Sequence, residues 1–360
     1  MSEFAIGLHS GTRFIHTDRV ATILPPADDD PPYRKMVALR AFTRGATNLA
    51  LVKELRARTA APMKKCVEAL AASADDVEGA VAWLRKSGVA SAAKKAGRGA
   101  NEGAVAVAAT DRELAVIELN SETDFVARNT VFQELARGVV RSALALGAAE
   151  AAAGPAPRDL DLGALGRAPL AADGGGGGGS GAPPVAEAVG VAAGTLGENL
   201  VLRRACVLRL ADGAPGLIAR YVHNAYADGV GRTAAAVALQ SEAADADALR
   251  RLGEQLAMHV VAAAPLYLER DGVSAEHLER EREILVQRAR ASGKPDPIVE
   301  KMVQGQLTKF YQEVVLLDQP YVVDPEAGAV RKMLAAASKE LGAEVALGGF
   351  VRYHVGQGEV

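Results

Sequence analysis

The stretch RELAVIELNSE at residues 112–122 returns in altered form as RTAAAVALQSE at residues 232–242. Both stretches carry a run of apolar residues as long as a strand, and both end in leucine, a polar amide, serine and glutamate. Each is preceded by another strand candidate, GAVAVAAT at 103–110 and GLIARYVHN at 216–224. This internal repeat predicts two related units that each begin with a pair of strands.

A helix is predicted after each strand pair, with the same apolar face in both copies. The matching residues are Leu135, Ala136, Val139 and Val140 in the first copy and Leu256, Ala257, Val260 and Val261 in the second. Two strands and a covering helix, given twice, predict an α+β fold. We place one core subdomain at residues 103–211 and the other at residues 212–272 together with 319–360.

The link between strand and helix differs between the copies. The first copy uses TDFVARN at residues 123–129, and the second uses AADAD at residues 243–247. The second copy therefore makes the same connection without an aromatic residue or a valine. Phe125 either folds back onto its own core or is exposed for a partner, and the difference between the copies favours exposure.

The chain before the repeat predicts a small helical docking module at residues 49–90. Three short helices are expected: one with Leu49, Val52 and Leu55 on its apolar face, one starting near Pro62, and one ended by Gly88. Residues 91–102 are small and basic, which favours a solvated linker over a phosphate-binding patch.

Two inserted segments interrupt the core. Residues 147–187 contain six consecutive glycines at 174–179, which predicts a flexible, disordered tether. Residues 273–318 predict a projecting antiparallel helical hairpin, because apolar residues follow one another at spacings of 3 and 4. This seam consists of Val299, Val303, Leu307, Phe310, Val314 and Leu317.

The seam of the hairpin allows two interpretations. Two hairpins could pack against each other and form a homodimer. Alternatively, Phe310 and Val314 pack against Leu278 and Leu285 within one hairpin. The sequence favours self-association.

Composition excludes several classes of function. A formal net charge of −3 provides no general basic field for nonspecific nucleic-acid binding, and no apolar run reaches the length of a membrane span. Residues 1–48 predict a disordered extension, in which MVALRAFTRGATN from Met36 resembles an organelle presequence. The alternative is a disordered bacterial extension.

The sequence contains none of the familiar catalytic or metal-binding constellations. The six histidines lack metal-ligand spacing, and neither cysteine has a nearby base in the sequence. His223 is expected at the surface and His259 in a satisfied core or interface position. We therefore expect a binding protein without catalytic chemistry, metal or cofactor.

Several longer stretches carry a family resemblance. They include LVKELRARTAAPMKKCVEAL at 51–70, ELNSETDFVARN at 118–129, LGENLVLRR at 196–204, SGKPDPIVEKMVQGQL at 292–307 and GGFVRYHVGQG at 348–358. In these motifs, and in their order over most of residues 49–358, the chain resembles the elongation factor Ts family. These proteins are guanine-nucleotide exchange factors of elongation factor Tu.

The resemblance implies a fold and a mechanism. It implies an N-terminal domain of ubiquitin-associated type, two α+β core subdomains and an inserted coiled-coil hairpin. It also implies that the protein binds elongation factor Tu in its GDP-bound and nucleotide-free forms. Asp124 and Phe125 would enter the nucleotide-binding domain, displace a helix and disturb the magnesium and phosphate site. The expected partner contacts are Thr123, Asp124, Phe125, Val126, His223, Leu55, Arg56 and Met63.

Departures from the family pattern leave alternatives open. The loop Ala60-Ala61-Pro62-Met63 stands where the family has Gly-Ala-Gly-Met, and the glycine-rich insert replaces an ordered segment. One rival function is an adaptor whose N-terminal module binds ubiquitin or nascent chains without exchange activity. Another is an enzyme that uses its glycines around a nucleotide. The expected location is the mitochondrion, with another organelle or the bacterial cytoplasm as the alternative.

Overall fold

The computed structural model describes residues 14–17, 20–23, 49–59, 61–149, 154–172, 181–291 and 293–357. The chain divides into two compact units, Met1–Gly88 and Val89–Val360. In the first, β1 (Phe14–Thr17) and β2 (Val20–Ile23) form a two-stranded antiparallel sheet. The rest of the extension, including the segment from Met36, lies outside the described residues, so its disorder and targeting role stay predictions.

The three helices predicted for the N-terminal module are present. They are residues 49–59, α2 (Met63–Ala72) and the start of α3 (Val77–Lys95). Val52, Leu55, Cys66, Leu70 and Ala80 form their shared core. Val52 and Leu55 lie inward as their periodicity predicted, whereas Leu49, on the same predicted face, is 55% exposed.

Helix α3 does not end at Gly88, contrary to the prediction, and it continues to Lys95. The residues after Gly88 pack on α7 (Val185–Leu196). The close approach is at Gly190, where an added Cβ would lie 3.3 Å from Cγ2 of Val89. Lys95 Nζ also donates to the carbonyl oxygen of Ala193 at 3.0 Å. Tertiary packing therefore keeps the first part of the predicted linker helical.

The predicted repeat of strand, strand and helix is confirmed. The first copy consists of β3 (Glu102–Ala109), β4 (Glu113–Ser121) and, after the short α4 (Asp124–Ala127), α5 (Thr130–Ala149). The second copy consists of β7 (Gly216–Ala227), β8 (Val230–Gln240) and α8 (Ala246–Ala263).

Both copies depend on a glycine at the start of the first strand. Gly103 has φ +133° and Gly216 has φ +135°, a region of backbone conformation that disfavours other residues. A Cβ at these positions would lie 2.2 Å from the carbonyl oxygen of Leu119 and 2.0 Å from that of Leu239. The same close contact therefore sets the strand pairing in both copies.

The strands form one seven-stranded sheet rather than two separate sheets. The order is β5-β6-β4-β3-β8-β7, and β9 (Ala346–His354) also pairs with β8. Here β5 is Arg158–Asp159 and β6 is Val201–Arg209. Strands β3 and β8 meet through only two residue pairs, Val105 with Gly231 and Ala106 with Val230. Two half-sheets are thus joined at a short seam, and the α+β class is confirmed.

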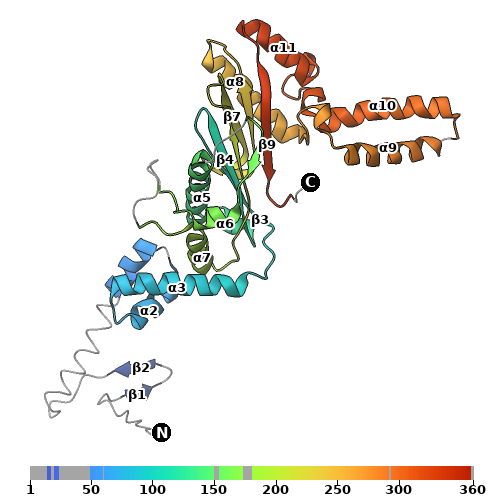
Figure 1. Cartoon of the computed structure of the whole chain (residues 1–360). Helices are drawn as coiled ribbons and strands as arrows, with labels where there is room; N and C mark the ends of the chain where they lie inside the picture. The colour runs from blue at the N-terminus through green and yellow to red at the C-terminus, as the bar shows by residue number, and fades with distance from the viewer. Residues whose placement is uncertain are drawn as a thin grey trace, which may run out of the picture. The chain divides into compact units, whose positions relative to one another are not determined.

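The two half-sheets face each other across a buried apolar layer. Val107, Val116 and Leu208 of the first half lie in one cluster with Ile218 and Val351 of the second. The other face of the first half is covered by α5, α6 (Leu162–Arg167) and α7, and that of the second half by α8 and α11 (Val330–Leu341). Figure 1 shows these helices along the sheet. The core is therefore layered as helix, sheet, sheet, helix.

Much of the insert at residues 147–187 is ordered, so the prediction of disorder is wrong for residues 154–172 and 181–187. Strand β5 pairs with β6, and Leu165 of α6 is fully buried. Pro155 lies against β9, where an added Cβ on Gly349 would be 2.0 Å from its carbonyl oxygen. The six glycines lie outside the described residues.

The predicted helical hairpin is present as α9 (Ala275–Arg290) and α10 (Asp296–Val314), which lie side by side in Figure 1. Short 3-10 helices flank its base at η1 (Arg270–Gly272) and η2 (Leu316–Asp318), and η3 (Pro325–Ala327) follows. Leu316 and Leu317 lie in the core of the second half, so the hairpin ends earlier than predicted.

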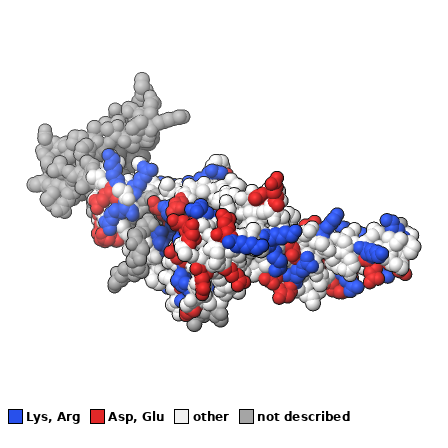
Figure 2. Space-filling model, turned by 90° about the horizontal axis from the view of Figure 1, so that it is seen from above, with Lys and Arg blue, Asp and Glu red and all other residues white. Residues whose placement is uncertain are grey.

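The seam of the hairpin is covered within one chain. Val299 and Val303 pack with Leu285, and Phe310, which is 8% exposed, packs with Leu278. The expectation that this seam stays open for a second copy is therefore wrong. Positive and negative side chains are interspersed along the hairpin in Figure 2. Self-association stays a prediction, now without an apolar seam to support it.

Candidate functional site

The TDFV segment forms a single helical turn between β4 and α5. Thr123 stands at the N-cap of α4 in extended conformation, with φ −128° and ψ 157°. Val126 and Ala127, at 9% and 0% exposure, belong to the core cluster beneath α5. Two consecutive buried residues therefore fix the rotation of this turn about its own axis.

Phe125 points away from that core and is 80% exposed. Among the described residues, no other large apolar side chain is so exposed. The prediction that Phe125 faces solvent is confirmed, and the alternative, in which it folds back, is wrong. Val126 lies on the opposite side of the turn, so it anchors the turn and does not present a free contact surface, contrary to expectation.

The backbone before Phe125 is held by Glu198, which follows α7. Glu198 Oε2 accepts hydrogen bonds from the backbone N–H of Glu122 at 3.1 Å and of Thr123 at 3.0 Å. Its Oε1 accepts from the Thr123 hydroxyl at 2.6 Å, and the Ser121 hydroxyl donates to the Thr123 carbonyl at 2.8 Å. The Thr123 side chain is thus engaged within the protein, although it was predicted as a partner contact.

Asp124 is half exposed and lies beside Arg128, with 3.9 Å between Asp124 Oδ2 and Arg128 Nε. The Arg128 guanidinium lies over the ring of Tyr226 from β7, 5.0 Å from its centroid. A cation over an aromatic face is attracted by the ring's charge distribution. This contact joins the TDFV turn to the second half of the sheet, and neither Arg128 nor Tyr226 was singled out from the sequence.

His223 is exposed on β7, three residues before Tyr226, as predicted. Its Nδ1 lies 3.5 Å from the hydroxyl of Tyr221. Asn224 adopts a positive φ of 50°, and the pairing with β8 shifts between Ala225 and Ala227. The end of β7 therefore carries an exposed histidine and, through Tyr226, a contact to the TDFV turn.

The N-terminal unit presents a second candidate surface. Met63 is 52% exposed, and Val67, one helical turn later, is 43% exposed. Arg56 is also exposed. Leu55 is fully buried in the core of this unit, so its predicted role as a partner contact is wrong. Val67 and Met63 therefore form an exposed apolar pair on α2.

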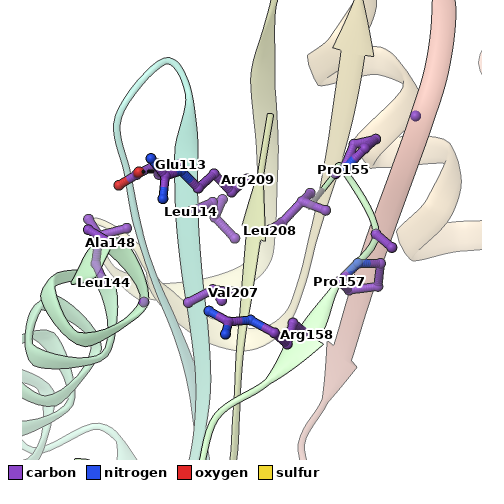
Figure 3. Close-up of a pocket in the computed structure, with 14 residues that line it drawn as sticks. Glu113, Leu114, Leu144, Ala148, Pro155, Pro157, Arg158, Val207, Leu208 and Arg209 are labelled. Atoms are coloured by element: carbon purple, nitrogen blue, oxygen red, sulfur yellow. Dashed lines mark ion pairs between the residues drawn. The ribbon is translucent and has the colours of Figure 1, made fainter. Parts of the chain in front are cut away.

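A separate cavity of about 480 Å³ lies in the core unit. It lies between the end of α5, strands β4 and β6 and the segment around Pro155 and Pro157, as Figure 3 shows. Glu113 and Arg209 form an ion pair at its rim, with 2.9 Å between Oε1 and Nε. No predicted site residue lines this cavity, so the candidate site is a surface and not a pocket.

The buried histidine of α8, His259, is satisfied by hydrogen bonds. His259 Nδ1 accepts from the backbone N–H of Val322 at 3.2 Å, and its Nε2 lies 3.0 Å from Gln319 Oε1. A neutral imidazole with its proton on Nε2 fits both partners. Burial lowers the pKa of this histidine. The prediction of a satisfied core histidine is confirmed.

Two kinds of candidate site, metal centres and membrane spans, are absent among the described residues. This part of the chain contains no group of three or more histidine, cysteine or acidic side chains placed to hold a metal ion. Within the same residues, no helix has the length and apolar character to cross a membrane. What the surface does offer is one exposed aromatic on a braced turn.

Comparison with known proteins gives consistent matches. The family model for elongation factor TS matches residues 122–357. The chain is 46% identical over 309 residues to elongation factor Ts of Rhodospirillum rubrum, which covers 86% of this chain and 92% of that protein. It is 44% identical over 313 residues to the elongation factors Ts of Brucella ovis and Brucella canis, again with 86% and 92% coverage.

Proposed function

Because the chain belongs to the elongation factor Ts family, we propose that it binds elongation factor Tu and accelerates the release of GDP from it. Phe125 is the group that enters the nucleotide-binding domain of the partner, close to the magnesium and phosphate site. Asp124 contacts the partner beside it. The complex of this protein with the nucleotide-free partner then takes up GTP, and GTP binding releases the protein.

The exposure of Phe125 is the observation that supports this proposal most directly. An aromatic side chain left in water on a rigid turn contributes little to its own fold. The same side chain contributes strongly when a partner covers it, because aromatic anchors supply much of the binding energy of protein interfaces. The turn is braced by buried Val126 on one side and by Glu198 on the other.

Exchange follows from preferential binding to the open state of the partner. A nucleotide bound at nanomolar affinity represents about 12 kcal/mol of binding free energy. A protein can weaken that binding only to the extent that it prefers the partner without nucleotide, and nucleotide then weakens the protein's binding equally. The Phe125 side chain supplies such a preference if its site in the partner is closed while GDP is bound.

The direct test is stopped-flow release of fluorescent GDP from elongation factor Tu, with and without this protein. We expect the release rate to rise with the concentration of the protein and to saturate. Labelled GTP should not bind to the protein alone. A release rate that stays at the spontaneous value would refute the proposed function.

Met63 and Val67 support docking of the N-terminal unit on the same partner, with Arg56 as a polar contact. The same exposed pair is also what an adaptor for ubiquitin or nascent chains would use. Titration of the full-length chain with ubiquitin separates the two functions. Ubiquitin binding without any effect on GDP release would favour the adaptor, whereas an exchange factor needs no ubiquitin binding.

The named relatives also bear on location and partners. All three are bacterial proteins, which supports the bacterial cytoplasm as the location and gives no support to the mitochondrion. The interspersed charges of the surface in Figure 2 offer no extended basic face in that view, in keeping with a protein partner and not a nucleic acid.

A further inference from the structure

We propose that Glu198 is a positioning residue, which holds the Asp124–Phe125 turn in the geometry that partner binding requires. The proposal rests on the proposed function. Glu198 lies 74 positions beyond Asp124 in the numbering, at the end of a different helix. Its side chain nevertheless makes the hydrogen bonds that set the course of the backbone immediately before Phe125.

The contact between the two loops is reciprocal. Glu198 accepts from the backbone N–H groups of Glu122 and Thr123. In return, Glu122 Oε1 accepts from the backbone N–H of Asn199 at 2.7 Å. Each glutamate thus binds the main chain of the other's loop. Hydrogen bonds to a carboxylate are stronger than those between neutral groups, so this pair of contacts restricts both loops.

A third segment joins the same cluster. Asn199 Nδ2 donates to the carbonyl oxygen of Arg98 at 2.8 Å, and Arg98 approaches Glu122 Oε1 at 3.4 Å. Asn199 is only 4% exposed. Asn199 and Arg98 therefore hold the loop that carries Glu198 in place, so that Glu198 can restrain the TDFV turn.

Thr123 shows the consequence for α4. Threonine at an N-cap ordinarily accepts a hydrogen bond from a backbone N–H of the first helical turn. Here the Thr123 side chain makes no such cap and donates instead to Glu198 Oε1 at 2.6 Å. The start of α4 is thus oriented by Glu198. Because Val126 and Ala127 hold the other side of the turn in the core, the backbone that carries Phe125 is restrained on both sides.

Substitutions of Glu198 distinguish a role in positioning the TDFV turn from a role in the stability of the fold. In Glu198→Gln the amide oxygen can still accept from both N–H groups, and the amide nitrogen can donate to the Thr123 hydroxyl, which then accepts. Glu198→Leu has a similar size and no acceptor. Glu198→Asp keeps the charge but withdraws the carboxylate by one methylene, so it cannot reach all three donors.

The experiment combines GDP release from elongation factor Tu with hydrogen–deuterium exchange of the free full-length protein. We expect Glu198→Leu to lower the rate constant for accelerated release by roughly tenfold or more, as expected for loss of charged hydrogen bonds. Deuterium uptake should rise in the peptide spanning residues 118–129 and stay unchanged in α8. Glu198→Gln keeps these hydrogen bonds in a neutral, weaker form, so its release rate and deuterium uptake should be close to those of the original protein, and Glu198→Asp should resemble the leucine variant.

A double-mutant cycle with Phe125→Ala tests whether Glu198 acts through Phe125. If it does, Glu198→Leu causes little further loss in the Phe125→Ala background. Full additivity, an unchanged release rate in Glu198→Leu, or a fully active Glu198→Asp would each overturn the positioning role. If the original protein fails to accelerate release, the proposed function fails, while deuterium uptake still decides whether Glu198 restrains the turn.

Discussion

Replacing Phe125 by alanine should separate partner binding from stability. Complete burial of a phenylalanine contributes about 1.5–3 kcal/mol to folding, but Phe125 is 80% exposed. The fifth that is buried contributes only about 0.3–0.6 kcal/mol by the same scale. For a protein of this size, we expect Tm to fall by about 1–2 °C.

The expected loss in partner binding is much larger. Four-fifths of the phenylalanine is available to a partner. By the same scale, its truncation costs about 1.2–2.4 kcal/mol of binding free energy. That corresponds to a loss of about 10- to 60-fold in affinity. Asp124→Ala should lose less, because Asp124 is a half-exposed polar residue.

The assay is stopped-flow release of fluorescent GDP from elongation factor Tu at several concentrations of each variant, together with thermal unfolding. Val260→Ala is the control, because Val260 is a fully buried valine of α8 in the second half of the core, away from the TDFV turn. It should lose about 2 kcal/mol of stability and retain most of its activity well below its Tm. If Phe125→Ala releases GDP as fast as the original protein, or unfolds as easily as Val260→Ala, our reasoning about this turn is refuted.

Three further predictions concern other parts of the chain. Deleting residues 1–88 should weaken complex formation and leave the unfolding of the core unchanged, as measured by titration and calorimetry; a collapse of the core's Tm would show that the unit is structural. Replacing residues 275–314 by a short turn should leave a folded core, because Leu316 and Leu317 are retained. If the hairpin mediates self-association, the original protein should sediment as a dimer and this variant as a monomer; a monomer in both would contradict the prediction of self-association. Because burial lowers the pKa of His259 below its ordinary 6.5, the unfolded chain binds this proton more readily than the folded one, so the free energy of unfolding should fall as pH drops from 7.5 to 5.5. In His259→Asn, denaturant unfolding should show a smaller pH dependence, although not none, because burial also lowers the pKa of His354; an equal dependence would contradict this assignment.

Local pattern was sufficient for the elements of the core and for one part of the site. The repeat of strand, strand and helix follows from apolar periodicity, which records the face that each element buries. The exposure of Phe125 was predicted by comparing the two copies of the repeat, because the second copy connects its strand and helix without an aromatic residue. His259 was placed correctly because an apolar helix face surrounds it. These inferences need only neighbours in sequence.

Contacts between distant segments decided the rest. Leu55 has the periodicity of a buried residue, and its complete burial in the helical unit removes it from the partner surface. Helix α3 passes through Gly88 because Val89 and Lys95 find partners on α7, and that packing outweighs the weak preference of one glycine for a helix end. Glu198 supports the TDFV turn from a loop that no local pattern connects with it. A hydrogen bond depends on where two segments meet in space, and apolar periodicity carries no information about that meeting.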